Sequence, residues 1–312
     1  MKILFLSLAL LGTFTTSCKR DVETVKLNGS ETDPNAPPST WKEHWFEHNQ
    51  LVKLVSYNDE VAVYYDDDMP RDITWPLRIS TAIWKYTKET YGVFGKAKDK
   101  RMFVILHFNK YGGGHPFTFF DASHDYRNGI DVGSNNPWAD SSGWNLDIVA
   151  HEVGHIVEGA SKGVHNSPAF PIWHDSKWME IYQYDVYKNL GWDAEALRWY
   201  NDKMNAVDPY PRAGTQWFKN WFYPIYRDHG GKEALNGFFV MLSRHFPQKT
   251  IPLGKEYTRD MNLGEFVHFW SGAAKTDLKQ LALDAFGPKD EQGNDWVPQF
   301  ETAQVQFPGI TY

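Results

Sequence analysis

Cysteine is almost absent from this sequence of 312 residues: Cys18 is the only one, so disulfide bonds play no part in the fold. No dense run of lysine and arginine occurs, and the net charge is −7, which argues against a nucleic-acid-binding protein because such proteins usually present a basic face. No GxSxG motif is present, and the glycines of YGGGHP (residues 111–116) are not followed by the Lys-Ser/Thr of a phosphate-binding loop. Only the N-terminus carries a long apolar segment, so we expect no other membrane span.

Hydrophobic residues make up 42% of the chain and aromatic residues 16%, enough for a sizeable core in one large domain or two tightly joined lobes. The fourteen tryptophans are expected mainly in that core. The alternative is that some of them form platforms for sugar rings or for apolar side chains of a substrate.

The N-terminus has a short basic start at Lys2, an apolar stretch from Ile3 to Phe14, and small or hydroxylated residues before Cys18. This segment resembles a bacterial lipoprotein signal. The resemblance implies a signal peptide over residues 1–17, acylation of Cys18 and export to a bacterial membrane, with the outer membrane or cell surface expected. An ordinary secretory signal is the alternative. The polar residues up to position 40 then form a flexible tether, which leaves residues 41–312 as the folded domain.

Strand patterns dominate the first part of this domain, and helical patterns dominate the second. Two alternating segments, 51–57 and 60–66, predict a hairpin that turns at Asn58-Asp59. Further strands are expected at 101–108 and 128–134, a helix at 75–91, and a flexible loop at 111–116. Helical spacing then predicts a helix from Trp144 to about Gly159 and several more helices after it. We therefore expect an α+β fold, with a strand-rich lobe over about 41–140 and a mostly helical part over about 141–312.

The motif HEVGH at residues 151–155 lies on that first helix of the second part. Residues four apart share a helix face, so His151 and His155 can present two imidazole nitrogens to one zinc ion. Glu152 lies beside them and is free to act as a base toward a water molecule. Gly154 lets another element approach closely. The alternative is a pair of partly exposed histidines with Glu152 in an ordinary surface contact.

HEVGH resembles the HExxH motif of zincin metallopeptidases, and the resemblance implies a zincin-like fold, a zinc cofactor and a third protein ligand. The position where a metzincin has its third histidine is Ser161 here, which argues against that branch. The gluzincin branch takes a Glu from a following helix, and the matching residue is Glu180, with Trp178 two positions before it. The other candidates for third ligand are His165, His174, Asp175 and Glu158.

Residues around the metal are expected to orient its ligands and to stabilise the oxyanion of a tetrahedral intermediate. Asp147, one turn before His151, is a candidate outer partner, whereas Asp185 is off the usual spacing for that role. Glu158 is another candidate partner. The strand at 101–108 or the strand at 128–134 is expected to be the edge that pairs with extended substrate. The candidate oxyanion donors are Tyr182, Tyr184, Tyr187, His174 and His165.

The order of helix, Pro-containing loop and Trp-x-Glu helix is similar to basic-secretory-protein-like and enhancin/mucinase-like secreted bacterial peptidases. This resemblance implies a zinc metallopeptidase that hydrolyses peptide bonds of extracellular proteins or glycoproteins. We expect it to be a monomer that is anchored to the membrane only through Cys18. A surface-anchored glycan- or peptide-binding protein on the same scaffold is one alternative, and a glycoside hydrolase is another. Asp66-Asp67-Asp68 is interpreted as a solvated turn, with a calcium site as the alternative.

Overall fold

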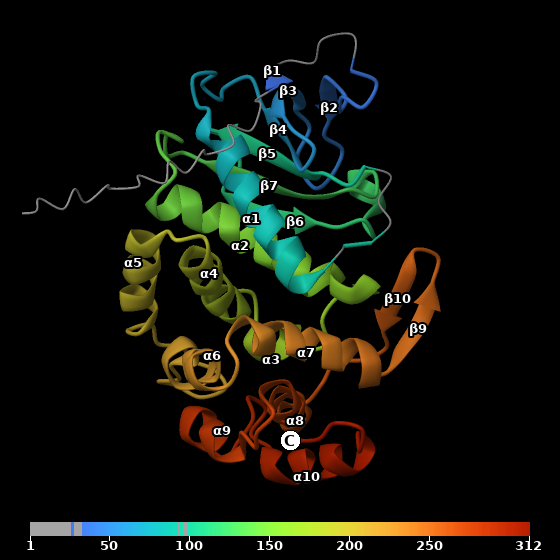
Figure 1. Ribbon diagram of the computed structural model, residues 1–312, viewed down its shortest axis with the longest axis vertical. Coiled ribbons are helices and arrows are strands. Elements are labelled where there is room, and N and C mark those ends of the chain that lie inside the picture. The colour runs from blue at the N-terminus through green and yellow to red at the C-terminus, as the bar shows by residue number, and fades with distance from the viewer. Residues whose placement is uncertain (1–25, 28–32, 93, 96–98) are drawn as a thin grey trace, which may run out of the picture.

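The computed structural model describes residues 26–27, 33–92, 94–95 and 99–312. The predicted signal peptide, Cys18 and most of the tether lie outside these residues. The strand-rich lobe lies at one end of the molecule and the C-terminal helices lie at the other (Figure 1). No helix in the described part of the chain is long and apolar enough to cross a membrane.

A seven-stranded mixed sheet forms the first lobe, with the order β1-β3-β4-β5-β7-β6 and with β2 paired to β3. Pairs β4–β5 and β5–β7 are parallel, and pairs β3–β4 and β6–β7 are antiparallel. The strands are β1 (Lys26–Leu27), β2 (Thr40–Lys42), β3 (Leu51–Tyr57), β4 (Val61–Tyr65), β5 (Met102–Phe108), β6 (Gly113–Phe117) and β7 (Asn128–Ser134). The predicted hairpin is confirmed as β3–β4, where the Asn58 side chain accepts hydrogen bonds from the backbone N–H groups of Glu60 and Val61.

The central strand β5 is apolar on both sides because both faces of the sheet are covered. Its residues Met102, Val104 and Leu106 face the main core. Its residues Phe103 and Ile105 face a smaller cluster on the opposite side, built around Trp41 and Trp45. The helices α1 (Trp75–Tyr91) and α2 (Gly143–Ala160) cross the first of these faces (Figure 1).

The prediction of a flexible loop at 111–116 is wrong, because Gly113–Phe117 forms the edge strand β6. Glycine and proline have little tendency to form strands on their own. Here the free edge of β7 supplies the pairing, and a proline such as Pro116 is tolerated at an edge, where a missing N–H need not interrupt a ladder.

The second part is helical, as expected, so the predicted α+β organisation is confirmed. A small sheet of β8 (Val164–His165), β10 (Gly254–Tyr257) and β9 (Gln248–Ile251) lies within it. The hairpin of β9 and β10 was not predicted, nor were the helices over Phe170–Trp173, Asp193–Lys203 and Trp296–Gln306. The helices after α2 are α3 (Phe170–Trp173), α4 (Lys177–Asn189), α5 (Asp193–Lys203), α6 (Tyr223–Asp228), α7 (Lys232–His245), α8 (Leu263–Ala274), α9 (Lys279–Phe286) and α10 (Trp296–Gln306).

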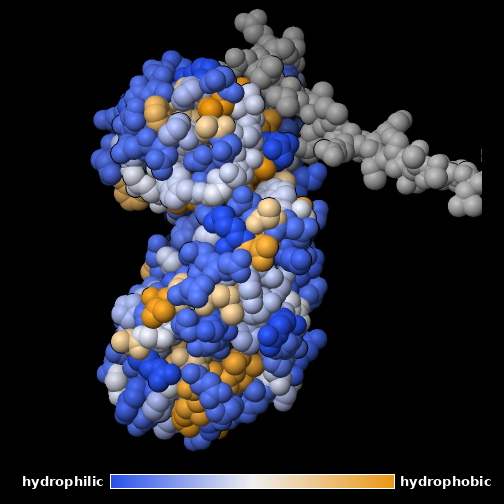
Figure 2. Space-filling model, turned by 90° about the vertical axis from the view of Figure 1, so that its left-hand side faces the viewer, coloured by the Kyte–Doolittle hydropathy of each residue, from blue (hydrophilic) through white to orange (hydrophobic). Residues whose placement is uncertain are grey.

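Tryptophan serves mainly to fill the interior. Eight tryptophans are fully buried: Trp84, Trp138, Trp173, Trp178, Trp217, Trp221, Trp270 and Trp296. The face that lies on the left in Figure 1 is mostly hydrophilic with scattered apolar areas, and a notch separates its upper and lower parts (Figure 2). The aromatic content therefore supports core packing over an exposed row of sugar-binding platforms.

Candidate active site

The HEVGH residues lie on α2, as predicted, on a helix packed between the sheet and α4. A Cβ added at Gly154 would lie 2.5 Å from Sδ of Met179 and 2.9 Å from Cδ1 of Tyr182, so the glycine allows α4 to approach. The Nε2 atoms of His151 and His155 face each other at 3.2 Å. Two imidazoles from adjacent turns thus converge on one point.

Asp175, in the turn between α3 and α4, brings a carboxylate to these two rings. Its Oδ1 lies 3.4 Å from Nε2 of His155, and the ligand atoms of the three residues all lie within 4.8 Å of one another. Ligands at about 2.0–2.2 Å from a tetrahedral zinc ion are separated by about 3.3–3.5 Å, and the separations of 3.2 Å and 3.4 Å at His155 are close to that range. Asp175 was among the alternative third ligands.

Glu158 orients the second histidine from the side away from this point. Its Oε2 lies 3.0 Å from Nδ1 of His155, and its other oxygen accepts a hydrogen bond from Nε1 of Trp173. A carboxylate at Nδ1 favours a proton on that nitrogen and leaves the Nε2 lone pair directed toward the metal position. Glu158 therefore acts as the outer partner of His155, one of the two roles that the sequence suggested for it.

Burial shifts the pKa values of His151, Glu152 and His155. It lowers the pKa of His151 to about 4, with the neighbouring His155 acting in the same direction, so this imidazole is neutral at physiological pH. Burial also raises the pKa of Glu152 to about 7. For His155, burial lowers the pKa, but the hydrogen bond and charge of Glu158 outweigh it and the net pKa is raised.

A cleft of about 530 Å³ opens beside these residues. Its lining includes Gly114, His115 and Pro116 of β6, with Glu152, His155, Glu158, Gly159, Asn166, Ser167, Phe170, Pro171, Asp175 and Asp260. A Cβ added at Gly114 would lie 2.6 Å from Oε1 of Glu152, so a larger residue would require either the edge strand or the carboxylate to move.

The edge strand at the cleft is β6, and neither strand predicted for that role occupies it. Residues 101–108 correspond to β5, which lies between β4 and β7, and residues 128–134 correspond to β7, which lies between β5 and β6. The expectation for 128–134 was wrong because the segment taken for a loop extends the sheet by one strand. The expectation for 101–108 was wrong because β5 is paired with β4 on one side and with β7 on the other. The remaining sequence signal was the run of glycines before His115, which permits close approach of the backbone.

The structure does not bring Glu180, the predicted third ligand, into the group formed by His151, His155 and Asp175. Its Oε1 accepts a hydrogen bond from Nζ of Lys177 at 2.6 Å, and Lys177 also pairs with Asp208 at 2.9 Å. Glu180 is buried, and burial raises the pKa of its carboxyl. Its other oxygen, Oε2, has no hydrogen-bond partner among the described residues.

The candidate outer carboxylates lie apart from the imidazoles. Asp147 accepts hydrogen bonds from the Tyr187 hydroxyl at 2.8 Å and from Arg198 at 2.6 Å. Asp185 accepts one from the Tyr86 hydroxyl at 2.7 Å. Neither carboxylate therefore has the position that Glu158 has at His155.

None of the five candidate oxyanion donors is among the described residues that line the cleft. In the interior, the Tyr182 hydroxyl is hydrogen-bonded to Thr87, and the Tyr187 hydroxyl donates a hydrogen bond to Asp147. Tyr184 packs against other tyrosines, Tyr200 and Tyr223 among them.

The two candidate histidines pair with acids of the C-terminal part. Nδ1 of His165, in β8, lies 3.3 Å from Glu256, and Nε2 of His174, directly after α3, lies 2.9 Å from Glu291. Asn166 and Ser167, between β8 and α3, line the cleft instead, and nothing in the sequence distinguished them from their neighbours.

The chain matches no protein-family model and no curated protein. Solved structures that it matches include an M1 zinc metallopeptidase from Deinococcus radiodurans, at 14% identity and a TM-score of 0.42, covering 81% of this chain and 51% of that one. A mutant of that enzyme bound to a Tyr-Ser-Ala substrate matches at 13% identity and a TM-score of 0.38, covering 84% and 50%. The chain thus spans about half the length of these proteins.

Proposed function

We propose that this chain is a zinc-dependent peptidase in which His151, His155 and Asp175 hold the metal and Glu152 is the catalytic base. The observation that carries the proposal is the convergence of two imidazole nitrogens 3.2 Å apart and a carboxylate oxygen 3.4 Å from one of them, beside an open cleft. A zinc ion held by these atoms would act as a Lewis acid toward a peptide carbonyl.

The residues of the chain divide the remaining work. Glu152 takes the proton of the attacking water and returns it to the amine that leaves, so one carboxylate serves both halves of the hydrolysis. The edge strand β6 offers free backbone groups to an extended peptide, which places the scissile bond next to Glu152. Glu158 keeps the His155 ring in its orientation.

The substrate class that we propose is protein or glycoprotein outside the cytoplasm. This part of the proposal depends on the lipoprotein-like N-terminus, which would anchor an exported domain through Cys18. A chain held at a membrane surface by one lipidated residue needs no partner subunit to reach such substrates, so we propose a monomer.

The test combines metal analysis with one variant of the base. The full chain and its Glu152→Gln variant are assayed for zinc by plasma mass spectrometry and for hydrolysis of casein and of a mucin-type glycoprotein. We expect both proteins to hold zinc and the variant to lose about 10²- to 10⁴-fold in kcat/KM, the usual contribution of a general base. Glu89→Gln, at an exposed position of α1, is the matched control and should hydrolyse like the original chain.

Other results identify the alternatives. Zinc without hydrolysis in either protein would indicate a binding protein on the same scaffold. A chain that takes up no zinc would contradict the peptidase, and hydrolysis of glycosidic bonds by such a chain would support a glycoside hydrolase.

A further inference from the structure

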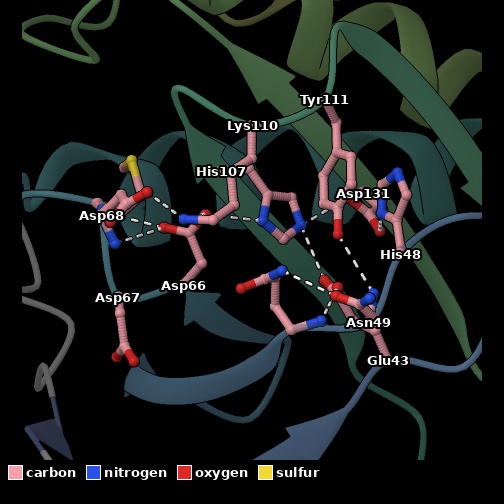
Figure 3. Close-up of polar contacts among 12 residues, drawn as sticks. Glu43, His48, Asn49, Asp66, Asp67, Asp68, His107, Lys110, Tyr111 and Asp131 are labelled. Atoms are coloured by element: carbon pink, nitrogen blue, oxygen red, sulfur yellow. Dashed lines mark hydrogen bonds and ion pairs between the residues drawn. The ribbon is translucent and has the colours of Figure 1, made fainter.

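A second group of imidazoles and carboxylates lies on the face of the sheet opposite α1 and α2 (Figure 3). It consists of Glu43 and His48 from the segment between β2 and β3, His107 at the end of β5, and Asp131 of β7. All four residues are buried, with exposed fractions of 1%, 8%, 0% and 1%, and their ligand atoms all lie within 4.8 Å of one another. None of the four lines the cleft beside HEVGH.

Three atoms of this group point at one another. Nε2 of His107 lies 2.9 Å from Oε1 of Glu43 and 3.0 Å from Oδ1 of Asp131, which are ion-pair distances if the ring is protonated. All three atoms are buried, and none makes a hydrogen bond of good geometry among the described residues. Two carboxylate oxygens that share one buried ring nitrogen in this way call for an explanation.

The other polar atoms of the same side chains are already engaged. Oε2 of Glu43 accepts a hydrogen bond from the backbone N–H of Gln50 at 2.7 Å. Oδ2 of Asp131 contacts Nε1 of Trp45 and Nδ1 of His48, each at 2.8 Å. These contacts fix both carboxylates so that their remaining oxygens face Nε2 of His107.

Asp66 holds the His107 ring from its other side. Its Oδ2 lies 3.0 Å from Nδ1 of His107, and its Oδ1 accepts hydrogen bonds from the backbone N–H groups of Asp68 and Met69. Asp66 is fully buried, so the interpretation of residues 66–68 as a solvated turn is wrong for this residue. The contact at Nδ1 is the kind of outer-sphere support that orients a histidine ligand.

The charges of this group are not balanced by one imidazole. Lys110 lies 3.8 Å from Asp66, and His48 contacts the outer oxygen of Asp131. Glu43 has no cationic partner other than His107 within the part of the chain that the structure describes. An unbalanced charge in a buried site is strongly destabilising, and a divalent cation at the convergence point would balance it.

We propose that Glu43, His107 and Asp131, with His48 as the fourth group, form a second and structural site for a divalent metal ion of the zinc type. One imidazole with two carboxylates suits zinc and other transition metals better than calcium or magnesium, which prefer oxygen ligands alone. Four buried residues leave no open position for a substrate, which is typical of a structural site.

Such an ion would join the segment between β2 and β3 to the sheet beside the cleft. Asp131 pairs in register with His115 of β6, and the neighbouring Gly114 lies against Glu152. Metal at the second site would therefore stiffen the strand that we propose for substrate binding. The second site is independent of the peptidase proposal, because its four residues take no part in that chemistry.

The competing explanation is a protonated His107 clamped between carboxylates with no metal. Burial lowers the pKa of His107, but its contacts with Asp131, Asp66 and Glu43 outweigh burial and raise that pKa to about 11. A test must therefore count metal ions directly.

The experiment empties the first site and asks whether metal remains. The full chain carrying His151→Ala and His155→Ala is loaded with ZnCl2, desalted and analysed by plasma mass spectrometry. We expect one zinc ion per chain. Adding Glu43→Gln should remove it, whereas adding Glu47→Gln, an exposed acid in the same segment, should leave it in place. Parallel loading with CaCl2 should leave no bound ion.

Folding is monitored by circular dichroism in every variant, and the count in the double variant needs no change at the second site. A folded double variant with no zinc would overturn the proposal, as would zinc that persists after Glu43→Gln. If Glu43→Gln does not fold, the melting temperature of the double variant decides: EDTA should lower it, and an unchanged value overturns the proposal. Hydrolysis of casein by the original chain tests the peptidase separately.

Discussion

The two imidazole–carboxylate groups of this chain use the same residue types on opposite faces of one sheet, but only one of them is open. At HEVGH the third member of the group, Asp175, has a side chain that is 76% exposed, and a cleft lies beside Glu152. Around His107 every member is buried, and three carboxylates contact a single ring.

The two proposed sites therefore differ in solvent exposure and not in residue type. An open group can exchange water and substrate, whereas a closed group can only hold its neighbours together. The open group is supported by one outer carboxylate, Glu158, and the closed group by Asp66 and by backbone donors. The following predictions test whether openness is the property that matters.

The largest effect is expected at the exposed carboxylate of the open group. Asp175→Ala removes the exposed side chain that we propose as a ligand, without disturbing the core. We therefore expect zinc affinity at this site to fall by more than the about 10- to 100-fold that the loss of an outer partner costs. Competition with a chromophoric chelator measures it. Glu158→Gln should give the smaller loss, within that 10- to 100-fold range.

Glu180→Gln is the decisive comparison, because the sequence predicted Glu180 as the ligand. In the structure Glu180 pairs with Lys177, so its substitution should lower the melting temperature and leave zinc affinity unchanged. A larger loss of zinc affinity in Glu180→Gln than in Asp175→Ala would restore Glu180 as the third ligand.

Local patterns in the sequence were sufficient for the α+β order of elements and for the helix that carries HEVGH. Those features follow from hydrophobic periodicity and from spacing along one helix, which act over a few residues. The direction of Asp175 depends on how the turn between α3 and α4 packs, and no local pattern encodes it.

The group around His107 could not be predicted from local patterns either, because Glu43, His107 and Asp131 come from three distant segments. One signal was present: His107 is the only polar residue of the buried strand β5, and Asp131 is the only charged residue of the buried strand β7. A polar residue in such a strand needs a partner. The identity of that partner depends on the order of the strands in the sheet, which local sequence patterns do not determine.

A second effect is expected at the strand that separates the two groups. Gly114→Ala places a Cβ 2.6 Å from Oε1 of Glu152, so either β6 or the carboxylate must move. A misplacement of about 1 Å can cost about 100-fold in rate, and we expect kcat/KM on casein to fall by up to that factor. Metal content should not change.

Gly112→Ala is the matched control, because a Cβ at that position meets no atom within 4 Å. It should hydrolyse casein like the original chain. Equal activity in Gly114→Ala and Gly112→Ala would mean that the position of β6 next to Glu152 is unimportant for hydrolysis.

The smallest effect is expected at a buried carboxylate that belongs to neither group. Asp185 of α4 accepts hydrogen bonds from the Tyr86 hydroxyl and the Asn189 amide, and no imidazole contacts it in the described structure. Burial raises the pKa of its carboxyl to about 6 from an ordinary value of 3.8. The folded state therefore binds this proton more tightly than the unfolded state, so its contribution to stability is complete below about pH 4 and is lost as the pH rises through 6.

Asp185→Asn cannot ionise and should remove this dependence while keeping an acceptor for Tyr86. The difference in unfolding free energy between the variant and the original chain should move by about 2 kcal/mol in favour of the variant from pH 4 to pH 7. Urea unfolding at the two pH values measures it. A difference that stays constant would show that the Asp185 carboxyl has an ordinary pKa. Burial alone, without a cationic partner, would then be insufficient to raise the pKa of a carboxyl in this protein.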